Sequence, residues 1–109
     1  ARLPGLSRRR PEELFRLAEE LAADRDRLPA ALETLRGWLR DLLVARTAPG
    51  AVPLLHPDRA GELARQAAAW SVEELVAALD AVESGAAALR RNANRTLVAE
   101  RVLLRLARP

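Results

Sequence analysis

The sequence contains no cysteine, no lysine and a single histidine, His56. The absence of cysteine excludes a disulfide framework, a thiol nucleophile and a cysteine metal site. The absence of lysine excludes the phosphate-binding motif G-x-x-x-x-G-K-[ST]. One histidine in a proline-rich stretch is a poor basis for a Ser-His-Asp triad or a histidine-rich metal site. We therefore expect the chain to hold no catalytic residue, no cofactor and no metal.

Long apolar runs are also missing. No uninterrupted stretch approaches the ~18 apolar residues of a membrane-spanning helix, and no signal-peptide pattern is visible. These absences favour a cytoplasmic protein without a membrane partner. The 109 residues are the length of one domain. Because the chain begins with Ala1 rather than methionine, we expect a fragment or a processed chain.

Residues that favour β-strands are scarce. Isoleucine is absent, and the only aromatic residues are Phe15, Trp38 and Trp70. Strands are enriched in β-branched and aromatic side chains, whereas alanine and leucine, which dominate this sequence, favour helices. The composition therefore predicts an all-α fold.

The charge pattern does not indicate a strong polyanion binder. All 18 residues of the Lys+Arg class are arginine, yet the formal net charge is only +3. Acidic and basic residues are interspersed, as in the stretch EELFRLAEELAADRDR, and a dense basic cluster is missing. A helical nucleic-acid-binding module remains an alternative, and it would use Arg8–Arg10, Arg90, Arg91 and Arg95.

The apolar periodicity predicts five helices joined by short polar turns and one proline-rich loop. Residues 1–10 have no period and are expected to form a linker or tail. A helix of residues 72–92 would be the longest. The five predicted helices span residues 11–23, residues 27–46, a segment that opens at Pro57 and includes Trp70, residues 72–92 and residues 95–108.

Local motifs mark where several of these helices begin. Ser71 and Glu74 have the spacing of a capping box, and Asn94 is in position to cap the last helix. Asp24 or Asp26 can cap the second helix. The glycine at position 85 interrupts the fourth helix at a cost of about 1 kcal/mol relative to alanine, which indicates a close helix crossing or a slight bend.

The last predicted helix is apolar on more than one side. Leu97 and Leu104 lie apart from its main apolar arc, beyond a polar stripe that contains Arg101, Arg105 and Arg108. An unused apolar strip on a terminal helix favours a partner, and central burial of the helix inside the domain is the alternative. The main arc consists of Val98, Ala99, Val102, Leu103, Leu106 and Ala107.

Three stretches together resemble a known family. They are LAEELAADRDRLPAALETL, LRGWLRDLLVAR and LLHPDRAGELARQAAAWSVEELVAALDAVESGAAALRRNANRTLVAERVLLRL. Their order and spacing are similar to the C-terminal domain of bacterial DNA polymerase III clamp-loader subunits, above all the delta-prime type, with the gamma/tau type second. One departure is Arg95, which stands where the family commonly has proline after the asparagine.

The resemblance implies that residues 11–109 form a helical collar domain of a longer AAA+ subunit. In that family, collar domains pack side by side and hold together a pentameric ring that loads the sliding clamp on primed DNA. The implied partners are the collar domains of gamma/tau and delta, while DNA and the clamp are reached only through the parent complex. The family's arginine finger lies in the AAA+ module, so no catalytic residue is carried over.

A collar domain must offer surfaces to two different neighbours, as a heterologous ring requires. We expect these surfaces on the last helix and on the flank of the second helix. A role inside the domain is the alternative for each residue. The predicted interface residues are Trp38, Arg40, Asp41, Leu97, Arg101 and Leu104.

Overall fold

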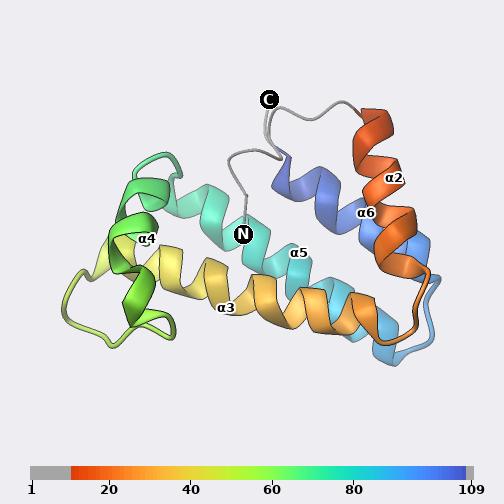
Figure 1. Ribbon diagram of the computed structural model, residues 1–109, viewed down its shortest axis with the longest axis horizontal. Coiled ribbons are helices and arrows are strands. Elements are labelled where there is room, and N and C mark those ends of the chain that lie inside the picture. Colours follow the sequence, from red (N-terminus) through yellow and green to blue (C-terminus); the bar gives the residue numbers. More distant parts are fainter. Residues whose placement is uncertain (1–10, 108–109) are drawn as a thin grey trace.

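The structure, a computed structural model, describes residues 11–107, and within them all regular secondary structure is helical (Figure 1). This confirms the predicted all-α class. The tail predicted for residues 1–10 and the part of the polar stripe at Arg108 lie outside the described residues. The elements are α2 (Pro11–Ala22), α3 (Arg27–Thr47), the 3₁₀-helix η1 (Pro57–Arg59), α4 (Ala60–Ala67), α5 (Val72–Arg90) and α6 (Arg95–Leu106).

The two long helices α3 and α5 run antiparallel along the length of the domain (Figure 1). Helix α6 turns back along α5 after a short connection, and α2 packs on α6 at the same end of the domain. Helix α4 packs on α3 at the opposite end. The apolar faces of all these helices contribute to one continuous core.

The core side of α3 follows the predicted leucine spacing. Leu28, Leu32, Leu39 and Leu42 are buried, and Leu35 is half-buried. Alternating steps of four and three residues keep these side chains on one narrow stripe of a helix with 3.6 residues per turn. The stripe therefore aligns α3 against its neighbours along its whole length.

The predicted caps of α5 and α6 are confirmed. The Ser71 hydroxyl accepts a hydrogen bond from the Glu74 N–H at 3.0 Å, and the Glu74 carboxylate accepts one from the Ser71 N–H at 2.8 Å. The Asn94 side-chain oxygen accepts from the Leu97 N–H at 3.0 Å. These bonds satisfy N–H groups that have no partner inside a helix.

The first turn of α3 is capped differently from the prediction. Asp26 occupies the N-cap position, but its side chain makes no capping hydrogen bond. The Asp24 carboxylate instead accepts from the Asp26 N–H at 2.8 Å. It thereby stabilises the turn before the helix rather than the helix start itself.

Two predicted helix lengths need correction. The third helical segment consists of η1 and α4 and ends at Ala67, so Trp70 lies in the following turn, where it is still buried. Helix α5 ends at Arg90, because Asn92 adopts a positive φ of 62°. Helix α3, with 21 residues, is therefore the longest helix described.

The end of α5 has the hydrogen bonds of a Schellman motif. The Ala93 N–H bonds to the Ala88 carbonyl at 3.0 Å, and the Asn92 N–H bonds to the Leu89 carbonyl at 3.0 Å. These bonds satisfy carbonyl groups of the last helical turn. Asn92, with its left-handed backbone conformation, reverses the direction of the chain. The reversal directs the chain into α6.

Gly85 lies where α6 packs tightly against α5. A Cβ atom at this position would lie 3.0 Å from Val102 Cγ2 and 3.2 Å from Val98 Cγ1. These separations are shorter than ordinary van der Waals contact, so a larger side chain forces the helices apart. The glycine thus marks a close crossing, which is one of the two interpretations that the sequence left open.

We predict that Gly85→Leu destabilises the domain by about 1–3 kcal/mol, because overpacking at this crossing displaces α6. The matched control is Ser84→Leu, which adds the same side chain at the exposed neighbouring position. Urea denaturation followed by circular dichroism measures both. Equal stabilities of the two variants would contradict the close crossing.

Candidate interaction surface

The predicted interface residues fall into two groups on different helices. Trp38, Arg40 and Asp41 belong to α3, at the end of the domain where α4 packs. Leu97, Arg101 and Leu104 belong to α6, which packs on α2 and α5. The structure therefore places the two groups in different surroundings, and each group is considered by itself.

Asp41 is fully buried and fastens the loop that follows α3. Its Oδ1 atom accepts the Leu55 N–H at 2.8 Å, and its Oδ2 atom accepts the His56 N–H at 2.8 Å. The His56 ring contacts the same Oδ2 atom through Nδ1 at 2.8 Å. Arg40 donates to Asp41 Oδ1 at 3.0 Å and to the Pro53 carbonyl at 2.9 Å. One carboxylate thus holds the far end of the loop against α3.

The pKa of the Asp41 carboxyl follows from these contacts. Burial raises this pKa, but the hydrogen bonds from Leu55, His56 and Arg40 together lower it by more than burial raises it. The pKa therefore lies below its ordinary value. The carboxylate is therefore ionised at neutral pH. Because an ionised carboxylate only accepts hydrogen bonds, Nδ1 of His56 carries the hydrogen in this contact.

Trp38 is also an internal residue. Its side chain is 3% exposed, and its Nε1 atom donates to Gln66 Oε1 on α4 at 2.9 Å. The His56 ring meets the indole edge-on at a centroid distance of 5.5 Å. The Arg59 guanidinium lies 4.9 Å from the ring centroid, and Arg59 also pairs with Glu62.

These contacts give Trp38 and Asp41 a role inside the domain, which was the alternative left open for each residue. Both side chains are buried in contacts between α3, the loop and α4, and neither is exposed to a neighbouring protein. Arg40 keeps part of its side chain in solvent, but its guanidinium already bridges Asp41 and the loop. An interface role for Arg40 stays a prediction, since its side chain is partly exposed.

Helix α6 carries the exposed part of the predicted set. Leu97 is 59% exposed and Leu104 is 48% exposed, and Arg101 between them is exposed as well. The leucines lie two helical turns apart and so share one face. The main apolar arc is buried as predicted: Val98, Ala99, Val102, Leu103 and Leu106. This leaves one face of α6 buried and a second apolar face open, rather than a helix covered on both sides.

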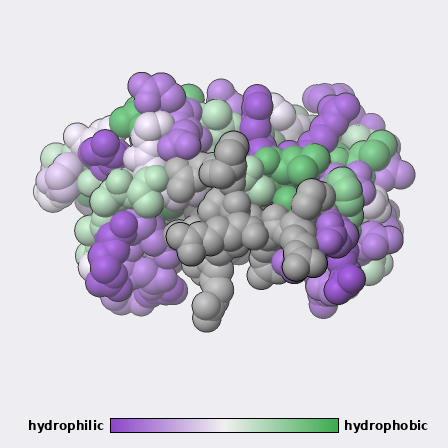
Figure 2. Space-filling view, turned by 90° about the horizontal axis from the view of Figure 1, so that it is seen from above, coloured by the Kyte–Doolittle hydropathy of each residue, from purple (hydrophilic) through white to green (hydrophobic). Residues whose placement is uncertain are grey.

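The surface at this end of the domain is mixed in character. On the face seen from above in Figure 2, hydrophobic side chains gather among hydrophilic ones at the end where α2 and α6 lie. The large hydrophobic side chains that α6 exposes are Leu97 and Leu104. Apolar side chains grouped on one face mark contact sites more often than single, scattered ones do.

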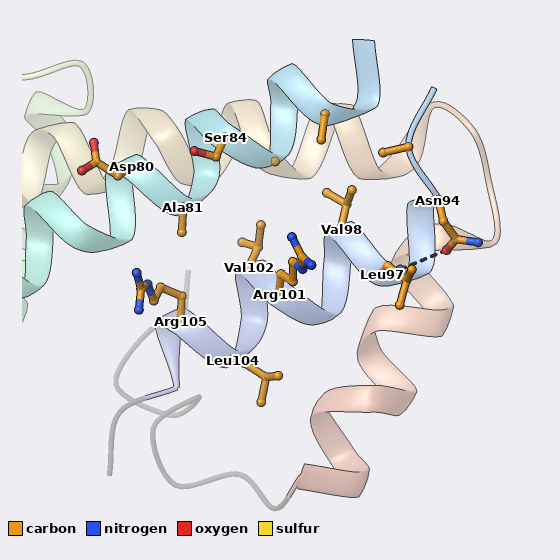
Figure 3. A pocket seen from close by; sticks show the side chains of 13 residues that line it. Asp80, Ala81, Ser84, Asn94, Leu97, Val98, Arg101, Val102, Leu104 and Arg105 are labelled. Atoms are coloured by element: carbon orange, nitrogen blue, oxygen red, sulfur yellow. Dashed lines mark hydrogen bonds between the residues drawn. The ribbon is translucent and has the colours of Figure 1, made fainter. Parts of the chain in front are cut away.

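A groove runs between this open face of α6 and α5 (Figure 3). Its volume is about 730 Å³, and the turn containing Asn94 lies at one end of it. Leu97, Arg101 and Leu104 all line it. Sequence reasoning did not select Arg105 or Asp80, which also line it. For Arg105 the signal was present, because it follows Arg101 by one helical turn.

Arg95 has a structural role that the sequence did not reveal. Its Nε atom donates to the Ala22 carbonyl at 2.9 Å, at the C-terminal end of α2. A cation at a helix C-terminus satisfies a carbonyl without an intrahelical partner and complements the helix dipole. Arg95 therefore ties the end of α2 to the start of α6. Of the other arginines named for a nucleic-acid module, Arg90 and Arg91 are exposed and Arg8–Arg10 lie outside the described residues.

The described side chains do not assemble a metal site. Over residues 11–107, no group of three or more His, Cys, Asp or Glu side chains is placed to hold a metal ion. In the same part of the chain, every helix is too short or too polar to span a bilayer. The candidate site is the α5–α6 groove with its exposed leucines, shown in Figure 3.

Fold and surface together define a small helical domain in which the last helix has one apolar arc buried and a second apolar face open. Residues 6–108 match the family described as DNA polymerase III, delta subunit, C terminal. The match spans nearly the whole sequence, and the chain belongs to this family. Comparisons with curated proteins and with solved structures find no match.

We predict that Asp41→Asn lowers the free energy of unfolding by about 1.5–3 kcal/mol at neutral pH, because hydrogen bonds to a charged group are lost. The folded pKa lies below the unfolded one, so this stabilisation is present above about pH 4 and is lost as the pH falls through the folded value. Urea titrations between about pH 3 and pH 7 compare the variant with Asp80→Asn, a change at an exposed position. If the free energy of unfolding fell equally steeply with decreasing pH in Asp41→Asn and in the wild type, the stabilising role of the Asp41 carboxylate would be contradicted.

Proposed function

We propose that this chain is the collar domain of a clamp-loader subunit of the delta-prime type, without a catalytic site of its own. Membership of the family of C-terminal domains of the DNA polymerase III delta subunit supports a role in the clamp loader. The delta-prime assignment rests on the resemblance of the stretch LAEELAADRDRLPAALETL. The gamma/tau type has the same architecture and is the second candidate. A cytoplasmic location in the replisome follows from this proposal.

The observation that carries the proposal is the open apolar face of α6. Leu97 and Leu104 expose about half of their side chains although the domain has a complete core beneath the same helix. An exposed apolar strip of this kind is typical of a protein contact. The proposed function of the strip is to pack against a neighbouring collar domain.

A second exposed apolar strip supports a contact with a further neighbour. Val72 and Val76 on α5 are 37% and 43% exposed, and they lie one turn apart on the outer face of that helix. A domain in a heterologous ring needs two different contact surfaces, one for each neighbour. The α6 strip and the α5 strip are two such surfaces, and they lie on different helices.

The nucleic-acid-binding alternative has less support. The Arg95 guanidinium is engaged by the end of α2, and the exposed leucines of α6 do not complement phosphate. A DNA contact through the parent complex remains part of the proposal, since the ring as a whole acts on primed DNA.

We predict that Leu97→Glu combined with Leu104→Glu leaves the fold intact but weakens assembly with full-length delta and gamma/tau subunits about tenfold or more. The two carboxylates place charge in an apolar contact, which carries a desolvation cost. Size exclusion with light scattering measures the complex, and circular dichroism measures the fold. Val52→Glu combined with Leu55→Glu is the control, because these residues are exposed elsewhere.

Each outcome of this experiment has a separate meaning. Loss of helical signal in the α6 variant would show that both leucines belong to the core. Equal weakening by the control would show that any added charge disturbs assembly. A wild-type chain that ignores delta and gamma/tau would overturn the proposed function, and a wild-type chain that forms trimers by itself would favour the gamma/tau type.

A further inference from the structure

Two turns at one end of the domain carry exposed arginines. Arg25 lies in the turn between α2 and α3, and Arg27 begins α3; both side chains are exposed. Arg90 ends α5 and Arg91 follows it, and both of these are exposed as well. We call these four residues the basic end. It combines arginines from two segments that lie far apart in the sequence.

Three observations place the two turns side by side. Helices α3 and α5 are antiparallel neighbours, so the start of α3 lies beside the end of α5 (Figure 1). Pro29 and Arg90 line the same small surface groove. The Arg95 guanidinium donates to the Ala22 carbonyl at 2.9 Å and so joins the start of α6 to the end of α2. Helix packing therefore fixes where the arginines of the two turns lie relative to each other.

The acidic residues near the basic end do not neutralise it. Among residues 11–107, no ion pair is found for any of its four arginines. The α2–α3 turn contains Asp24 and Asp26, and the Asp24 carboxylate already accepts the Asp26 N–H. Glu33 shares a groove with Arg90 but pairs with Arg36. Residues 91–94 contain no acidic residue. The basic end thus keeps an excess of positive charge.

The chemistry of the basic end favours phosphate over an apolar protein surface. No large hydrophobic side chain is exposed in residues 22–29 or 90–95, whereas protein contacts depend on aromatic and aliphatic anchors. Arginine forms paired hydrogen bonds with phosphate oxygens. Asn94 adds a donor, since its side-chain oxygen accepts the Leu97 N–H while its amide nitrogen points away from that bond (Figure 3).

We propose that the basic end binds the phosphate backbone of duplex DNA without reading its sequence. This contact goes beyond the proposed function, in which the chain serves assembly and the leucines of α6 form the contact. Helices that pack side by side have axes about 8–10 Å apart. Over that length one strand of B-DNA presents about three phosphates. Arginines from α3 and α5 are therefore spaced to contact neighbouring phosphates of one strand.

A duplex fits the basic end better than a single strand does. Proteins that bind single strands without sequence preference stack the bases on aromatic side chains. The aromatic residues of this chain lie elsewhere: Trp38 and Trp70 are buried, and Phe15 lies in the first half of α2, whose last residue is the one near the basic end. A duplex needs no stacking platform, because its bases stay paired and its phosphates face outward.

Binding of a fluorescein-labelled duplex of about 20 base pairs, followed by anisotropy between about 50 and 200 mM salt, tests the inference. For the wild-type chain we expect a Kd of about 10⁻⁶–10⁻⁴ M at the upper salt concentration, and tighter binding at the lower one. Replacing the four arginines by glutamine lowers the affinity at low salt about tenfold or more, and reduces the slope of log K against log salt by about 3–4. This variant combines Arg25→Gln, Arg27→Gln, Arg90→Gln and Arg91→Gln.

The matched control removes the same charge from exposed arginines outside the two turns. It keeps most of the affinity and most of the salt slope, because the phosphate contacts remain. Circular dichroism checks that both variants keep the helical fold. The basic-end variant also joins full-length delta and gamma/tau subunits as the wild type does, since assembly uses a different surface. The control combines Arg16→Gln, Arg65→Gln, Arg101→Gln and Arg105→Gln.

Several results would overturn the inference. Equal losses of affinity in the two variants would show a general effect of net charge. Tighter binding of a single strand than of the duplex would contradict the duplex assignment. Loss of DNA binding on removal of residues 1–10, which carry Arg2 and Arg8–Arg10, would place the site in that segment. Displacement of the duplex by poly-glutamate at equal charge concentration would identify a surface for acidic polypeptides.

The two proposals fail separately. A wild-type chain that assembles with the other subunits but does not bind the duplex would overturn this inference and leave the proposed function standing. A wild-type chain that binds the duplex through the basic end but ignores the other subunits would support this inference and overturn the proposed function.

Discussion

The close packing of α5 on α6 at Gly85 is the constraint on which the exposed face of α6 depends. Without a Cβ atom at this position, Val98 and Val102 approach the α5 backbone and fix the rotation of α6 about its own axis. That rotation places the main apolar arc inward and leaves Leu97, Arg101 and Leu104 outward. A modest rotation of α6 would exchange core and surface residues, so the glycine defines which side chains of α6 face solvent.

The sequence predicted those parts of the domain that depend on local interactions. The helix order, the capping box at Ser71 and the cap at Asn94 each rest on residues within one turn of one another. The division of the apolar side chains of α6 into a main arc and a separate strip followed from its periodicity alone. What the sequence did not decide was whether the strip would be covered by another part of the chain, because that depends on how far α2 reaches around α6.

The internal contacts of Trp38 and Asp41 could not be predicted for a similar reason. Asp41 lies beside the leucine stripe of α3. Only the folded loop after α3 brings the Leu55 and His56 N–H groups to its carboxylate. Trp38 likewise becomes internal through Gln66, 28 residues further along the chain. Such pairings between distant segments leave no mark in the local pattern. The contact of Arg95 is similar, since its partner, the Ala22 carbonyl, is a backbone atom and therefore invisible as a residue type.

The contact between the first and the last described helix has a consequence for the order in which the domain is completed. Helix α2 packs mainly on α6, and the Arg95–Ala22 hydrogen bond joins residues 73 positions apart. Loops that long close slowly compared with the local hairpins of α3, α4 and α5. On a ribosome α2 emerges before the other described helices, whereas α6, which covers its apolar side, is the last of them to be made. The buried face of α2, with Leu14, Ala18 and Ala22, thus stays uncovered until synthesis of the domain has finished.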